Sequence, residues 1–131
     1  MATAAMEFGR HRVEFDGDLL TLRLRGRVSQ SEAVEFHAML AQLLSERGRC
    51  FLLVDLRELE SIDPGARRHV GEWNRSHQIT AGAAFGANFA VRALMSLFLG
   101  AIKLMASDAP EIHMARDEAE ARRWLDARRA R

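Results

Sequence analysis

The 131-residue sequence predicts an α/β fold in which an N-terminal β-hairpin leads into alternating strands and helices, with a mostly parallel sheet and about four helices. Three patterns predict it: apolar and polar residues alternate before residue 25, apolar residues recur at helical spacing from residue 36, and residues 50–54 are continuously apolar. Apolar residues make up 48% of the chain, and no Pro/Gly/Ser-rich linker divides it. We therefore expect residues 1–131 to form a single domain, with residues 1–6 disordered.

The hairpin is predicted by residues 12–25. Val13 and Phe15 alternate with charged residues, and Asp16-Gly17 provides a turn, because glycine adopts the positive φ that tight turns need. After this turn, leucines alternate with polar residues over 20–25, as in a strand with one buried face.

The first helix and the strand after it have clear boundaries in the sequence. Ser29 and Glu32 fit a capping box, in which each side chain bonds the other residue's backbone N–H, and Gly48 suits the end of a helix. Cys50–Val54 is apolar throughout, which is typical of a strand covered on both faces. The apolar face of the helix consists of Phe36, Leu40, Leu43 and Leu44.

The rest of the chain continues the alternation of helices and strands. A second helix is predicted to begin at Asp63-Pro64 and to end near His77, because aspartate caps helices well and proline fits their first turn. The last predicted helix is acidic early and basic late, which matches the helix dipole. The remaining elements are a strand near 83–85, a helix over 88–105, a strand over 110–114 and a final helix from Arg116.

Charge and cysteine content narrow the class of protein. Nineteen basic and eighteen acidic residues give a net charge of +1, so no overall basic field draws in nucleic acid. Cys50 is the only cysteine, which excludes an internal disulfide, and we expect it to be a core residue. Residues 1–6 lack the features of a signal peptide, so we expect a cytoplasmic protein.

The sequence contains no recognisable catalytic or metal-binding set. His69, Trp73 and His77 share one helical face, but the two histidines are about 12 Å apart along the axis, too far to share a zinc ion. Gly82 and Gly86 precede a helix without the spacing of a phosphate-binding loop. We therefore expect no enzyme activity, no catalytic residue, no metal and no cofactor.

Three stretches resemble a known family. Leu53–Ala66 reads LVDLRELESIDPGA, a buried strand, a short loop and a helix start, and it resembles the STAS domain of anti-sigma-factor antagonists. Phe85–Arg92 (FGANFAVR) and Glu118–Leu125 (EAEARRWL) are similar to the STAS-like branch of small bacterial proteins. The resemblance covers nearly the whole chain. It implies a regulatory module whose partner is a protein, such as an anti-sigma-like regulator.

The start of the second helix departs from the family pattern. Signalling members carry Asp-Ser-Ser-Gly there, and a partner kinase phosphorylates a serine, whereas this chain has Asp63, Pro64, Gly65 and then Ala66. Ser61 precedes the aspartate and does not match the motif. The resemblance therefore implies the docking surface without the phosphorylation switch. We expect that surface at Ser61, Asp63, Gly65 and Arg68.

The helix over 88–105 is unusually apolar. Its polar or small residues form one narrow stripe, so the helix needs cover on more than one side. Two interpretations stay open: burial beneath the sheet and a neighbouring helix, or contact with a second subunit, an apolar ligand or a membrane surface. The contact residues in the second case would include Asn88, Arg92, Phe98 and Leu99.

These patterns favour a cytoplasmic, non-enzymatic STAS-like module that forms homodimers, binds a protein partner and does not bind nucleic acid. The alternative is a binding protein for a lipid or another apolar ligand, or a protein peripherally bound to a membrane, in each case through residues 88–105.

Overall fold

The computed structural model describes residues 4–77, 79–105 and 111–130. In this part of the chain six strands form one sheet, and every strand lies beside its neighbour in sequence. The first three strands are antiparallel, and the third to sixth strands are parallel. The strands are β1 (Ala4–Phe8), β2 (His11–Asp16), β3 (Leu19–Val28), β4 (Phe51–Ile62), β5 (Ala81–Phe85) and β6 (Ile112–Met114).

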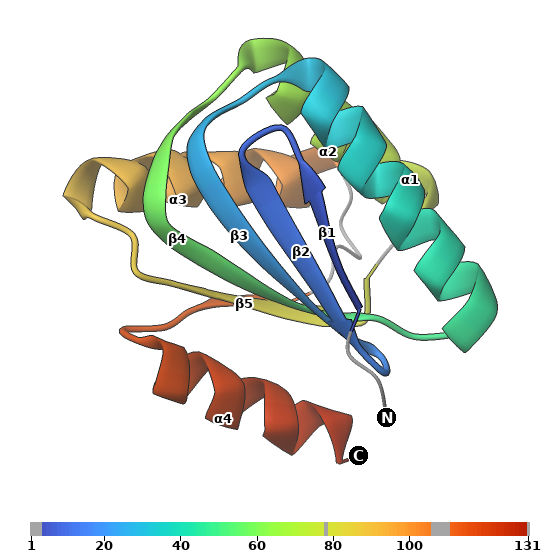
Figure 1. Ribbon diagram of the computed structural model, residues 1–131. Helices are drawn as coiled ribbons and strands as arrows, with labels where there is room; N and C mark the ends of the chain where they lie inside the picture. Colours follow the sequence, from blue (N-terminus) through green and yellow to red (C-terminus); the bar gives the residue numbers. More distant parts are fainter. Residues whose placement is uncertain (1–3, 78, 106–110, 131) are drawn as a thin grey trace.

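The helices divide unequally between the two faces of the sheet. They are α1 (Gln30–Arg47), α2 (Pro64–Ser76), α3 (Phe89–Met105) and α4 (Glu118–Arg129). The parallel strands β3 to β6 follow one another in one direction across the sheet. Because the crossover connections between parallel strands are right-handed, the three connecting helices α1, α2 and α3 lie on the same face. The fourth helix, α4, packs against β4, β5 and β6 on the other face, apart from α1–α3 (Figure 1). This arrangement confirms the predicted α/β fold with its N-terminal hairpin.

The start and end of α1 form as predicted. Ser29 Oγ accepts a hydrogen bond from the backbone N of Glu32 at 3.2 Å, and Glu32 Oε1 accepts one from the backbone N of Ser29 at 2.9 Å. Gly48 ends the helix with a φ of 78°, the left-handed conformation that favours glycine. The buried His11 places its Nε2 3.1 Å from Glu32 Oε1, which joins the start of α1 to β2.

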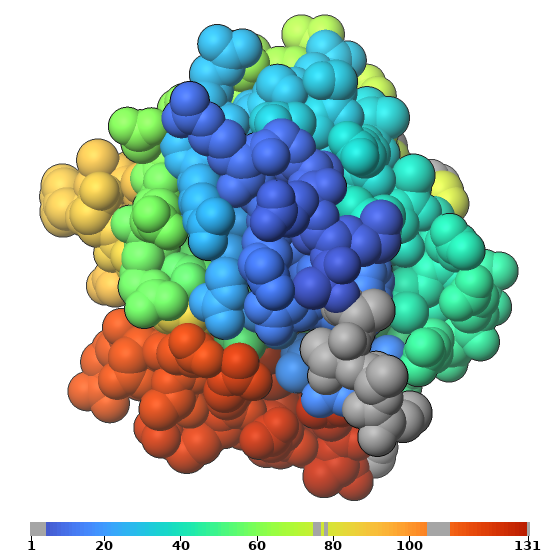
Figure 2. Space-filling view, viewed as in Figure 1, coloured from blue at the N-terminus to red at the C-terminus, as the bar shows by residue number. Residues whose placement is uncertain are grey.

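The N-terminus differs from the expectation of disorder over residues 1–6. Ala4–Phe8 form β1, which pairs with β2 along its whole length. Phe8 accounts for this order, because its side chain is buried and its ring stacks on that of Phe36 at 5.7 Å. Figure 2 shows β1 and β2 filling the surface between α1 and β3. Residues 1–3 lie outside the described part of the chain.

The strands β3 and β4 extend beyond the rest of the sheet. β5 pairs with β4 only over residues 51–55, whereas β3 pairs with β4 as far as Val28 and Ile62. The sequence predicts a loop in this part of β4. Two register shifts between β3 and β4 interrupt the usual alternation of inward and outward side chains. Leu56, Leu59 and Ile62 therefore turn inward at every third residue, and the sequence shows no alternation of apolar and polar residues in this part of β4. The extension carries the start of α2.

The two faces of the sheet are filled to different extents. On the face covered by α4, Leu53 is fully buried in one cluster with Phe85 and Leu125. On the opposite face, Leu52 and Val54 are only half-buried, although β4 is a central strand. These two side chains face a cavity.

Candidate functional site

The start of α2 brings together the four residues of the predicted docking surface. Ser61 and Arg68 are exposed, and Asp63 is half-buried between them in sequence. Asp63 occupies the N-cap position of α2 as predicted, but its side chain makes no capping hydrogen bond, and its carboxylate pairs with Arg27 Nε at 3.0 Å. Gly65 lies beneath α1, where a Cβ atom would come within 2.5 Å of Gln30 Oε1. Gly65 therefore serves the packing of α2 on α1.

The residue after Gly65 is closed to solvent. Ala66 is fully buried, in one cluster with Leu56 and Val91. A side chain at this position therefore points into the core. The nearest hydroxyl group that the sequence offers on β4 is that of the exposed Ser61, three residues before the helix begins.

A cavity of about 690 Å³ lies between the sheet and the helices α1, α2 and α3. Its floor is formed where Leu52 and Val54 of β4 pair with Gly82 and Ala84 of β5. Both residues of β5 are small, and at Gly82 the side chains of Ile112 and Ile79 occupy the place that a Cβ atom would take, at 2.9 and 3.3 Å. Cavities of this size that are mostly apolar are typical sites for small molecules.

One wall of the cavity is the inner face of α3. Phe98 and Leu99 are both half-buried and both line the cavity, together with Met95 and Ile102. The structure thus places these two predicted contact residues at one site. The predicted contacts Asn88 and Arg92 lie elsewhere, at the exposed start of the helix.

The outer face of α3 exposes large apolar side chains. Phe89 is 89% exposed, Leu97 77% and Leu104 91%. Arg92 and Lys103 lie on the same helix, which has no acidic residue. Among the described residues, no helix combines the length and the hydropathy needed to cross a bilayer. Helix α3 therefore packs against the core on one side and is exposed on the other.

A cluster of aromatic and histidine rings joins α1 to α2 at another wall of the cavity. His37 lies 4.8 Å from His69 and 4.7 Å from Trp73, and Trp73 stacks on His77 at 5.1 Å, all between ring centroids. Burial, and next the proximity of His69, lower the pKa of His37 to about 4 from its ordinary 6.5. His37 is therefore neutral at pH 7. Within the described ranges, no group of side chains could hold a metal ion.

Sequence reasoning missed His37 and the cavity. The signal for His37 is its position: Ala33, His37 and Leu40 follow the spacing of one helical face, and all three are buried. The cavity leaves no comparable signal, because it depends on how far three helices stand from the sheet.

Comparison with known protein families identifies the class of this chain. The SpoIIAA-like family model matches residues 19–126, so the chain belongs to the SpoIIAA-like family, which confirms the resemblance seen in the sequence. No curated protein matches the chain.

Two solved structures share the fold. An uncharacterised protein from Shewanella loihica with a SpoIIAA-like fold matches with a TM-score of 0.62 and 16% identity, over 95% of this chain and 92% of that one. The anti-sigma factor antagonist SpoIIAA in its unphosphorylated form matches with a TM-score of 0.57 and 10% identity, over 99% of this chain and 100% of that one. At these identities the likeness extends to the fold.

Proposed function

We propose that this chain is a non-enzymatic regulatory module that binds a protein partner through the start of α2. The observation that carries the proposal is the exposure of Ser61 and Arg68 on either side of Asp63, at the helix start where the family's signalling members meet their kinase. The absence of a serine at Pro64 and Gly65, where the signalling members carry their two serines, supports a module without the phosphorylation switch.

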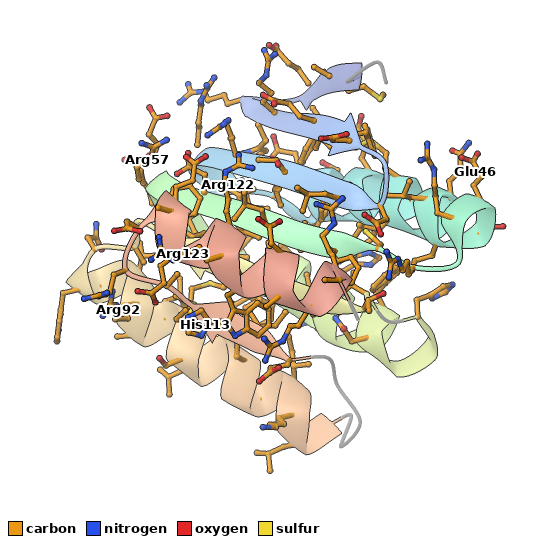
Figure 3. The ribbon with its side chains drawn as sticks, turned by 90° about the horizontal axis from the view of Figure 1, so that it is seen from below. Glu46, Arg57, Arg92, His113, Arg122 and Arg123 are labelled. Carbon is orange, nitrogen blue, oxygen red and sulfur yellow. The ribbon has the colours of Figure 1, made fainter. Side chains whose placement is uncertain are left out.

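An anti-sigma-factor kinase from the source organism is the partner to test. Isothermal titration calorimetry compares the wild type with Arg68→Glu and with Arg123→Glu, a matched charge reversal on α4, on the opposite face of the sheet (Figure 3). We expect Arg68→Glu to weaken binding about tenfold or more and Arg123→Glu to leave it unchanged, because reversing a charge inside an interface costs more than 1 kcal/mol. Equal affinities for the two variants would place the interface elsewhere.

The second candidate function is the binding of an apolar ligand beneath α3. It is supported by the cavity of about 690 Å³ and by the half-buried Leu52 and Val54 on its floor. Native mass spectrometry of freshly purified protein tests it. A bound acyl chain supports a carrier, whereas an unliganded protein under all conditions argues against one.

The exposed apolar residues of α3 also support contact with a second copy of the chain or with a membrane surface. Light scattering measures the first and co-sedimentation with vesicles the second. Leu97→Glu should abolish either contact without unfolding the protein, because Leu97 is 77% exposed. A Leu97→Glu protein that dimerises and co-sediments like the wild type would remove α3 from both interactions.

A further inference from the structure

The cavity beneath α3 has an unequal distribution of charge. Among the described residues that line it, only Lys103 and Glu111 are charged, and these two are also the only exposed ones. Exposed residues in the lining mark the opening of a cavity to solvent. The charges of the cavity therefore lie at its mouth, and its interior is apolar with the exception of the neutral side chains His37 and Asn74.

The negative charge at the mouth is already compensated. Arg128 donates two hydrogen bonds to Glu111 Oε1, from Nη2 at 2.7 Å and from Nε at 3.0 Å. Lys103 makes no ion pair or hydrogen bond to any described residue. Among the described residues, the mouth thus presents one uncompensated positive charge, that of Lys103.

The other polar side chains of the wall do not compete for an anion. Asn74 donates a hydrogen bond from Nδ2 to the carbonyl oxygen of Val70 at 2.8 Å. His37 is uncharged at pH 7, because burial lowers its pKa to about 4. In the described part of the cavity wall, Lys103 is therefore the single cationic group that a ligand meets.

We propose that the cavity holds a long-chain carboxylate, with its hydrocarbon chain among Leu52, Val54, Phe98 and Ile102 and its carboxylate paired with Lys103 at the mouth. The proposal rests on the second candidate function, the binding of an apolar ligand. One exposed lysine suits a head group with a single negative charge. Phosphate sites usually add arginine forks or the N–H groups of a helix N-terminus, and Lys103 lies instead in the last turn of its helix.

Tryptophan fluorescence provides a local readout. The chain has two tryptophans: Trp73 lines the cavity, and Trp124 stacks on His113 on the opposite face of the sheet. In a Trp124→Phe background the emission therefore reports on the cavity alone. Dodecanoate and 1-dodecanol are titrated at pH 8, since they share a chain length and differ in the charge of the head group.

The variant Lys103→Met removes the charge and keeps the length of the side chain. Its matched control is Arg92→Met, which removes the other basic residue of α3 at a position outside the cavity (Figure 3). We expect Lys103→Met to weaken dodecanoate binding about two- to fivefold and to leave dodecanol binding unchanged, the range for an exposed ion pair. Arg92→Met should bind both ligands like the wild type.

The outcomes separate this proposal from the function on which it rests. If dodecanol and dodecanoate bind equally, or if Lys103→Met and Arg92→Met behave alike, the head-group assignment is wrong and the apolar ligand site stands. If neither molecule binds the wild type, the apolar ligand function itself is refuted. Salt gives a check without any variant: dodecanoate binding should weaken as ionic strength rises, and dodecanol binding should not.

Discussion

Acidification from pH 7 should weaken the fold through one side chain, His37. The unfolded chain takes up a proton at this histidine below its ordinary pKa of 6.5, whereas the folded protein does so only below about 4. Between these two values the unfolded state binds more protons, so stability falls as the pH falls. Above 6.5 both states are neutral at His37, and the effect is absent.

The size of the effect follows from the two pKa values. A fall from 6.5 to about 4 corresponds to about 3 kcal/mol of unfolding free energy, most of it lost between pH 6.5 and 4.5. The physical cause is the desolvation of the ring between α1 and α2, strengthened by His69 at 4.8 Å and by His77. Such a loss is a large share of the stability of a domain of this size.

Urea unfolding followed by circular dichroism at pH 7.0, 6.0, 5.0 and 4.5 measures this loss. His37→Leu should remove most of the pH dependence and keep the fold at pH 7, since it also removes a buried Nδ1 atom without a partner in the described structure. His113→Gln is the control on the opposite face of the sheet, and its pH profile should follow that of the wild type (Figure 3). A wild-type stability that stays constant from pH 7 to 4.5 would refute the burial of a neutral His37. A His37→Leu protein with the wild-type slope would assign the effect to other groups.

Three further predictions concern the sheet, α3 and the start of α2. Leu53→Asp should cost about 3–5 kcal/mol and prevent folding, because it buries an unpaired charge in a central strand. A cooperatively melting Leu53→Asp protein would contradict the position of β4. On α3, Ile102→Glu should unfold the protein, because Ile102 is only 8% exposed. Leu97 is 77% exposed, so Leu97→Glu should keep a free energy of unfolding within about 0.5 kcal/mol of the wild-type value. Finally, incubation with ATP and a STAS-partner kinase should place no phosphate at the start of α2. Phosphopeptide mapping checks this, and phosphate on Ser61 would mean that the switch has moved along the chain.

Local signals in the sequence predicted those parts of the fold that local physics determines. The capping box of Ser29 and Glu32 and the left-handed Gly48 depend only on residues within one helix, and they form as expected. The side chain of Asp63 has the same chemistry, but Arg27 of a neighbouring strand takes its carboxylate. The strand β1 escaped prediction because its order depends on the contact of Phe8 with Phe36, a residue of α1.

The candidate site was harder to predict, because it consists of space as well as residues. The apolar excess of residues 88–105 pointed to α3, and Phe98 and Leu99 do line the cavity. Lys103 could be read only as part of the polar stripe on that helix. The role proposed for Lys103 at the mouth depends on the pairing of Glu111 with Arg128, which joins the segment before β6 to α4.

If the cavity beneath α3 holds the proposed apolar ligand, the supply of that ligand is linked to the lifetime of the protein. Side chains such as Leu52 and Val54 face the cavity instead of packed neighbours, so the empty protein lacks part of the contact energy of a filled core. A molecule that binds only the folded state adds about 2.7 kcal/mol when its concentration is about one hundred times its Kd. The melting temperature should then rise with ligand concentration. In a cell, where unfolded chains are removed by proteolysis, the abundance of this protein would follow the availability of its ligand.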